Sequence, residues 1–149
     1  MLARGHRLDL RIFRDMVADE HQPTQSRTTL SPQTVAGYDF AAQFALGLRL
    51  PDLCFAWHTD PQGLDGVTRR LWVATADASS WAAVDETDDG DEKSFTVWQQ
   101  GRRRLWDEVA TAWDWYTAEG YPEPGRFGMT ISPDGAHQPW LDGPGNLVL

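Results

Sequence analysis

Four short apolar runs follow one another between residues 53 and 99, and turn-forming residues separate them. They read LCFAW (53–57), LWVAT (71–75), WAAVD (81–85) and FTVWQ (95–99). Runs of this length, rich in aromatic and β-branched residues and bounded by Gly, Pro and Asp, are typical of β-strands. Because turns join them directly, we expect the four strands to form an antiparallel meander.

Further segments extend this pattern. The alternation in RLDLRIFR (7–14) predicts a half-buried strand, and RFGMTIS (126–132) and QPWL (138–141) predict two strands joined by a hairpin turn. Residues 38–50 and 101–116 repeat apolar residues at helical spacing. We therefore expect an α+β fold, an antiparallel sheet of about six or seven strands with two helices packed on one face.

The length of the chain favours a simple organisation. A chain of 149 residues can close one hydrophobic core, so we expect residues 1–149 to form a single domain. Residues 16–33 are polar and show no periodicity, which predicts a flexible loop or linker.

Charge and hydropathy exclude several classes of function. Twenty-two acidic and thirteen basic side chains give a net charge of -9, the wrong sign for binding nucleic acid through its phosphates. No apolar run approaches the ~18 residues that a membrane helix needs, and the start of the chain lacks the apolar stretch of a signal peptide. We therefore expect a cytoplasmic protein that binds neither nucleic acid nor a membrane.

The segment GRRRLWDEVATAWDWY (101–116) places three arginines before a helix that carries three of the eight tryptophans. On a helical projection the apolar stripe contains Leu105, Val109, Ala112 and Tyr116, with Trp106 and Trp113 on its flank. These aromatic residues are predicted to be core. Trp115 projects away from the stripe, so it lies either under a loop or against a binding partner.

The arginines themselves have two interpretations, because positive charge at a helix N-terminus opposes the helix dipole. Arg103 and Arg104 can pair with Asp107 and Glu108 at i, i+4 spacing. Alternatively, Arg102 and Arg103 hold an anion together with the free N–H groups that follow Gly101. The candidate contacts for a peptide or partner are Arg102, Arg103, Arg104 and Trp115.

No arrangement for catalysis or metal binding emerges. The single cysteine, Cys54, lies in an apolar run and is interpreted as a small buried hydrophobe. A metal site could draw on Cys54, His58, Asp60, Asp134 and His137, but their spacing matches no metal motif. The acidic run at 85–92 lacks the pattern of a calcium loop and is interpreted as a solvated hairpin tip. We predict no catalytic residue, no metal and no cofactor.

Several of these motifs occur together in one known family. The segment from Phe95 to Pro144, with GRRRLWDE, a Trp-rich middle, a Gly-x-Pro exit, RFGMT and a Trp-Leu strand, closely resembles the C-terminal accessory domain of actinobacterial methyltransferases related to protein-L-isoaspartate O-methyltransferase. Residues 39–55 and the segment LWVATADASSWAAVD are similar to earlier parts of that domain. Those enzymes often modify aspartates in ribosomally made peptides.

The resemblance implies a function without implying a catalytic site. Arg102 stands where the family has proline, and the methyltransferase domain with its S-adenosylmethionine site is missing. We therefore expect a free-standing copy or an excised piece of the accessory domain. Such a module would bind an acidic or aspartate-containing peptide, or a partner methyltransferase.

Two other hypotheses stay open. The chain could be a small α+β enzyme or ligand carrier whose pocket, between sheet and helices, is lined by Trp72, Trp98 and His58. It could also form a homodimer through surfaces that carry tryptophan.

Overall fold

The structure is a computed structural model that describes residues 23–59, 67–87 and 94–149. These residues form two compact units. The first contains Asp52–Glu108 and Met1–Pro32, the latter described from residue 23 onward, and the second contains Gln33–Pro51 and Val109–Leu149. Helix α4 (Leu105–Ala118) begins in the first unit and continues in the second.

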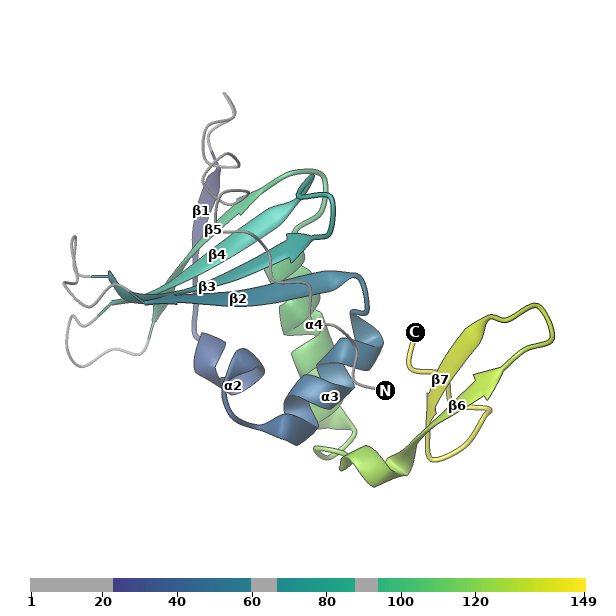
Figure 1. The fold of residues 1–149 in the computed structure, drawn as a ribbon. Coiled ribbons are helices and arrows are strands. Elements are labelled where there is room, and N and C mark those ends of the chain that lie inside the picture. Colours follow the sequence, from purple (N-terminus) through teal and green to yellow (C-terminus); the bar gives the residue numbers. More distant parts are fainter. Residues whose placement is uncertain (1–22, 60–66, 88–93) are drawn as a thin grey trace. The chain divides into compact units, whose positions relative to one another are not determined.

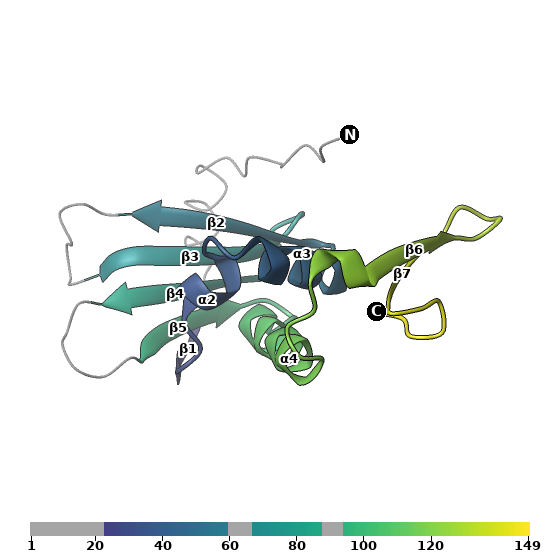
Figure 2. The same ribbon diagram turned by 90° about the horizontal axis from the view of Figure 1, so that it is seen from below.

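The first unit holds a five-stranded antiparallel sheet with the strand order β1-β5-β4-β3-β2 (Figures 1 and 2). Its strands are β1 (Thr24–Thr28), β2 (Leu53–Thr59), β3 (Val67–Thr75), β4 (Trp81–Thr87) and β5 (Phe95–Gln100). From β2 to β5 each strand pairs antiparallel with the next. The meander predicted from the four apolar runs is confirmed.

Strand β1 lies inside the segment 16–33, where the sequence predicts a loop. Four of its five residues are exposed, and it pairs with β5 at the edge of the sheet. An exposed edge strand has no buried face to impose alternation, so its polar sequence TQSRT gives no strand signal. The short helix α2 (Pro32–Ala36) begins at the end of the same segment. Residues 16–22 lie outside the described part of the chain.

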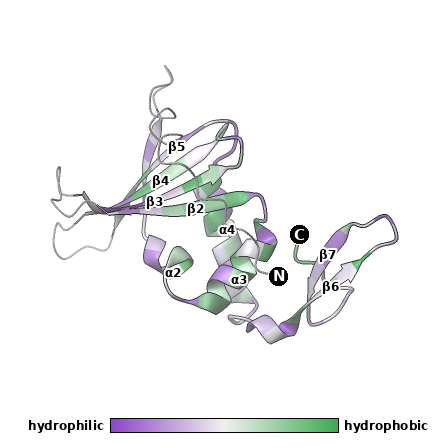
Figure 3. Ribbon diagram, viewed as in Figure 1, coloured by the Kyte–Doolittle hydropathy of each residue, from purple (hydrophilic) through white to green (hydrophobic). Residues whose placement is uncertain are grey.

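Both faces of the five-stranded sheet carry buried apolar residues. One face contains Leu71, Val73, Val84 and Val97, all fully buried. The other face contains a cluster of Trp72, Ala74, Trp81 and Ala83. The register pairs each of these tryptophans with an alanine, so the large rings lie beside small side chains. Burial on both faces explains why the runs are apolar throughout and do not alternate (Figure 3).

The second unit is built from helices and a hairpin. Helix α3 (Phe40–Arg49) begins after Asp39, whose carboxylate accepts hydrogen bonds from the N–H groups of Ala41 at 3.0 Å and Ala42 at 3.2 Å. Two alanines of α3, Ala42 and Ala45, form a core cluster with Tyr116 of α4. The partly buried residues packed against this cluster are Trp113, Trp115 and Phe127. Small residues on one helix thus accommodate aromatic rings on the other.

The hairpin follows a 3-10 turn, η2 (Pro124–Arg126), and consists of β6 (Phe127–Ile131) and β7 (His137–Leu141). The hairpin predicted around PDGAH is confirmed, and so is the α+β class with about seven strands. The expectation of a single sheet is wrong, because the strands divide into sheets of five and two. Pro139 has no N–H to donate to a further strand, so β7 is suited to the edge of a sheet. The strand predicted at 7–14 lies outside the described residues, and the packing of both helices on one sheet face stays a prediction.

Candidate functional site

The loop before α4 positions the three arginines. Gly101 adopts a φ of 103°, and a Cβ at this position would collide with the backbone of Ser79 and Ser80. The N–H of Arg103 donates to Oγ of Ser80 at 3.1 Å. The loop is therefore held against the turn between β3 and β4, and it sets the direction of each arginine.

Arg103 is engaged by two carboxylates within the first unit. Its Nη2 lies 2.5 Å from Oε2 of Glu108, and its Nη1 donates to the carboxylate of Asp52. The hydrogen bonds to Glu108 and then to Asp52 raise the pKa of the Arg103 guanidinium. The same ion pair lowers the pKa of Asp52. Arg103 is thus neutralised inside the protein.

The i, i+4 pairing expected for the arginines is wrong. Arg104 donates to the hydroxyl of Thr24 and lies 3.6 Å from the carboxylate of Asp107, three residues on, while Arg103 reaches Glu108, five residues on. The reason is that α4 begins at Leu105, so both arginines precede the helix and helical spacing does not apply to them. Arg102 is exposed and forms no hydrogen bond or salt bridge with another described residue.

A buried glutamine that sequence reasoning missed caps α4. Gln99 is 1% exposed, and its side-chain oxygen accepts the N–H of Trp106 at 2.8 Å. Its side-chain nitrogen donates to Asp107 at 3.1 Å. Asp107 and Glu108 place negative charge in the first turn, where the helix dipole favours it. The helix start is therefore stabilised from within, and the proposed anion site around Arg102 stays a prediction.

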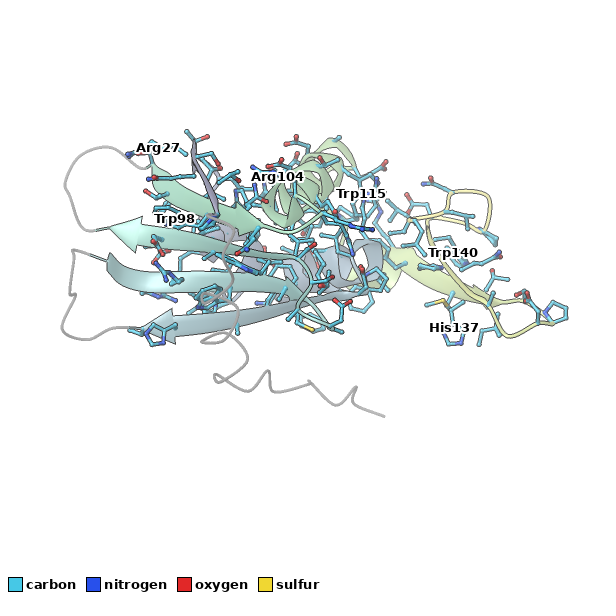
Figure 4. The ribbon with its side chains drawn as sticks, turned by 90° about the horizontal axis from the view of Figure 1, so that it is seen from above. Arg27, Trp98, Arg104, Trp115, His137 and Trp140 are labelled. Carbon is cyan, nitrogen blue, oxygen red and sulfur yellow. The ribbon has the colours of Figure 1, made fainter. Side chains whose placement is uncertain are left out.

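Trp115 lies in the second unit, where its ring contacts the guanidinium of Arg49 and the first residue of β6. The guanidinium of Arg49 sits 4.8 Å from the centre of its ring, and the ring of Phe127 is 6.3 Å away. Trp115 is half-buried and contacts a helix residue and a strand residue, and none of these contacts is with a loop (Figure 4). Trp115 thus supports the first residue of β6, and contact between its exposed part and a partner stays a prediction.

The core prediction for the remaining helix residues is confirmed except at Trp113, which is only half-buried. Leu105, Val109, Ala112 and Tyr116 are buried, and so is Trp106. Trp113 is half-buried and packs against the rings of Tyr116 and Tyr121, at 5.4 Å and 6.3 Å between ring centres. These aromatic residues build the protein interior.

Two of the three residues expected to line a pocket pack together, and the third, His58, lies apart from them. Trp72 and Trp98 lie in one cluster with Trp81, over the small side chains of Ala74 and Ala83. His58 is exposed near the end of β2, and Cys54 is half-buried. Among residues 23–59, 67–87 and 94–149, no group of three or more metal-binding side chains comes together. Asp60 lies outside the described residues.

Part of the acidic run does not form a solvated hairpin tip. Asp85 is 4% exposed, accepts two hydrogen bonds from Arg70, at 2.5 Å and 2.8 Å, and a third from the indole N–H of Trp98 at 3.1 Å. Glu86 lies 3.7 Å from Arg69 on the neighbouring strand. The register that places Asp85 opposite Arg70 was not visible in the sequence. The run beyond residue 87 lies outside the described part.

The β6–β7 hairpin exposes apolar side chains that sequence reasoning did not single out. Met129 and Ile131 alternate with Gly128 and Thr130 along β6, and their side chains are 46% and 65% exposed. On the opposite face the ring of Trp140 covers Gly128, where a Cβ would collide with it, and its N–H donates to Thr130 at 3.1 Å (Figure 4). One face is therefore covered by Trp140 while the other stays open. The alternation of apolar residues in FGMTI is the sequence pattern that could have indicated this apolar row.

The two edges of this hairpin differ. Along the outer edge of β7, Leu147 bridges to Trp140, and the N–H of Val148 donates to the carbonyl of Pro139 at 2.9 Å. Strand β6 pairs only with β7 in the described part of the chain. The edge of β7 is therefore covered, and the edge of β6 is open.

The ladder shows which backbone groups lie on that open edge. Hydrogen bonds from Ser132 to Ala136 and from Asp142 to Arg126 flank the hairpin. Because hydrogen-bonded pairs alternate in an antiparallel ladder, Gly128 and Thr130 bond to β7. Met129 and Ile131 then direct their N–H and C=O groups outward, on the edge next to the exposed apolar face. The N–H of Phe127, at the start of the strand, donates instead to the carbonyl of Pro124.

Comparison with known protein families, with curated proteins and with solved structures finds no match to this chain. None of the helices in the described ranges is long and apolar enough to cross a membrane.

Proposed function

We propose that this protein is a non-catalytic binding module that holds an extended polypeptide by adding it as a strand to the open edge of β6. This role agrees with the accessory domain that the sequence resembles, which is thought to hold a peptide substrate for a separate methyltransferase. The observation that carries the proposal is the combination, on one strand, of outward backbone groups and exposed apolar side chains.

Strand addition uses both of these features. Main-chain hydrogen bonds along the edge supply affinity, and alternate side chains of the added strand contact the apolar row formed by Met129 and Ile131. Natural proteins usually protect an exposed strand edge with charge, proline or a covering segment. Strand β6 carries no charged residue and no proline, whereas β7 has Pro139 and a covering segment. The unprotected edge therefore marks a binding surface.

A synthetic peptide with the core Val-Thr-Val-Thr-Val and two serines at each end tests the proposal. We expect it to bind, and to slow hydrogen exchange at the N–H groups of Met129 and Ile131. Met129→Pro removes one outward donor without removing a β6–β7 hydrogen bond, so it should weaken binding about tenfold or more. Tyr38→Ser, a change at a fully exposed aromatic residue of the same unit, is the matched control and should leave binding unchanged.

A second measurement keeps the test decisive if the proline disturbs the hairpin. Peptides N-methylated at the amides that face β6 keep every side chain but lose their main-chain donors. They should not bind to the unmodified protein. Equal binding by methylated and unmethylated peptides, or no binding at millimolar concentration, would rule out strand addition.

A further inference from the structure

The second unit has an excess of negative charge. It contains six carboxylate side chains against two arginines and no lysine; the acidic residues are Asp39, Asp114, Glu119, Glu123, Asp134 and Asp142. Both arginines are already engaged. Arg49 stacks on Trp115 and donates to the carbonyl of Val148 at 2.6 Å, and Arg126 pairs with Asp142 at 2.7 Å. Arg126 also interacts electrostatically with Glu119, so two carboxylates share one arginine and negative charge remains in excess in this unit.

Carboxylates lie at both ends of β6. Glu119 and Glu123 precede it, and the backbone carbonyl of Glu119 is 3.5 Å from the guanidinium of Arg126, the residue next to the strand. Neither glutamate side chain forms a hydrogen bond or salt bridge with another described residue. At the other end, Asp134 lies in the turn after β6 and accepts hydrogen bonds from its own loop, from Ser132 and Ala136. The segments that flank β6 thus carry more negative than positive charge, because Arg126 is the one basic residue among them and is paired with Asp142.

Resting on the proposed strand addition, we propose that the partner of β6 is a cationic peptide segment, with apolar residues at alternate positions and Lys or Arg at both ends. Five residues in a strand span about 17 Å, so the basic ends of an added segment would lie near the carboxylates that flank β6. Opposite charges at these ends attract across a distance comparable to the screening length of about 8 Å in physiological salt.

The same charges disfavour two other occupants. A second copy of this chain would bring identical carboxylates together, and each copy carries a net charge of -9. An acidic peptide, which the arginine motif predicts, would meet the same repulsion at β6. Of the three arginines in that motif, Arg103 and Arg104 are bonded within the first unit.

Three peptides that differ only in their ends test the proposal on the whole protein. Each has the core Val-Thr-Val-Thr-Val, and two Lys, two Ser or two Glu residues stand at each end. We expect the Lys peptide to bind about 3- to 10-fold more tightly than the Ser peptide at low salt, and the Glu peptide to bind most weakly. Raising the salt concentration to 0.5 M should reduce these differences.

Variants that remove single negative charges show which carboxylates cause the preference for the Lys peptide. Glu119→Gln and Glu123→Gln should each lower the preference for the Lys peptide while leaving the affinity for the Ser peptide unchanged. Asp114→Asn removes the same charge from α4, outside the segments that flank β6, and is the matched control.

The outcomes separate the two proposals. Equal affinity for the three peptides, combined with loss of binding in Met129→Pro, would overturn the cationic partner and leave strand addition standing. Tighter binding of the Glu peptide would also overturn it, in favour of an acidic partner. Failure of all three peptides to bind would remove both proposals. A dimer of the free protein that Met129→Pro dissociates would assign the edge to a second copy.

Discussion

The two units of this protein differ in how far they bury their large apolar side chains. In the first unit, large apolar residues such as Leu71 and Trp81 are buried on both faces of the sheet. Every large apolar residue that is exposed in the described part of the chain belongs to the second unit: Tyr38, Phe40, Tyr121, Met129, Ile131, Leu147 and Leu149. The first unit therefore buries its large apolar side chains, whereas the second leaves several of them exposed to solvent.

Their ion pairs differ in the same sense. Five of the six salt bridges in the described residues lie in the first unit, and that between Arg70 and Asp85 has an almost fully buried carboxylate. The second unit has one, between Arg126 and Asp142, with both side chains about half exposed. The ion pairs of the first unit thus hold its strands and the start of α4 together, and the proposal of strand addition to β6 rests on the second unit.

The largest expected effect compares truncation of two apolar side chains. Leu71→Ala in the first unit removes a fully buried side chain and should lower the free energy of unfolding by about 2–5 kcal/mol. Ile131→Ala in the second should change it by less than about 0.5 kcal/mol, because that side chain is largely exposed. Urea unfolding measures both. Similar losses for the two variants would contradict the contrast between the units.

A smaller difference is expected between the two acidic partners of arginine. Asp85→Ala leaves Arg70 and the indole N–H of Trp98 without their shared acceptor, and should destabilise the protein by about 2–4 kcal/mol. Asp142→Ala breaks a solvent-exposed pair and should cause a much smaller loss, because water and salt screen such pairs. Chemical denaturation of both variants at pH 7 measures the two losses, and an equal loss would remove the distinction.

The smallest effect concerns two turns and their response to acid. In the first unit Asp77 accepts hydrogen bonds from the N–H of Ser79 and the hydroxyls of Thr75 and Ser79, which lower its pKa to about 2. In the second unit hydrogen bonds from Ser132 and Ala136 lower the pKa of Asp134. A lowered pKa stabilises the folded state above the unfolded value of 3.8, and this stabilisation is lost as the pH falls toward 2.

Variants of Asp77 and Asp134 measure how much each carboxylate contributes to stability above its pKa. Asp77→Asn should flatten the fall in melting temperature between pH 4 and pH 2 more than Asp134→Asn does, because Asp77 accepts more hydrogen bonds. The opposite order in thermal melts would show that the turn of the second unit is the more strongly stabilised.

The sequence was sufficient where a segment carries its own local signal. Periodicity predicted β2 to β5, α3, α4 and the β6–β7 hairpin, because each buries an apolar face or ends at a recognisable turn. The same reasoning predicted the core positions of Trp106 and Tyr116. It failed at β1, which is an exposed edge strand and is held by pairing with β5, where the paired residues run from Thr28 with Phe95 to Thr24 with Gln99.

The candidate site depended on contacts between distant residues. For Arg103 the sequence predicted either Asp107 or a bound anion as its partner, and only the fold brings Asp52 to it, across 51 residues. Likewise, nothing local shows that Gln99 caps α4 or that Asp85 meets Arg70 and Trp98. Charge and apolar pattern are properties of short segments, so the sequence determines them directly. Which charges are neutralised and which strand edge stays open are decided by strand register and loop geometry, and these exist only in the tertiary structure.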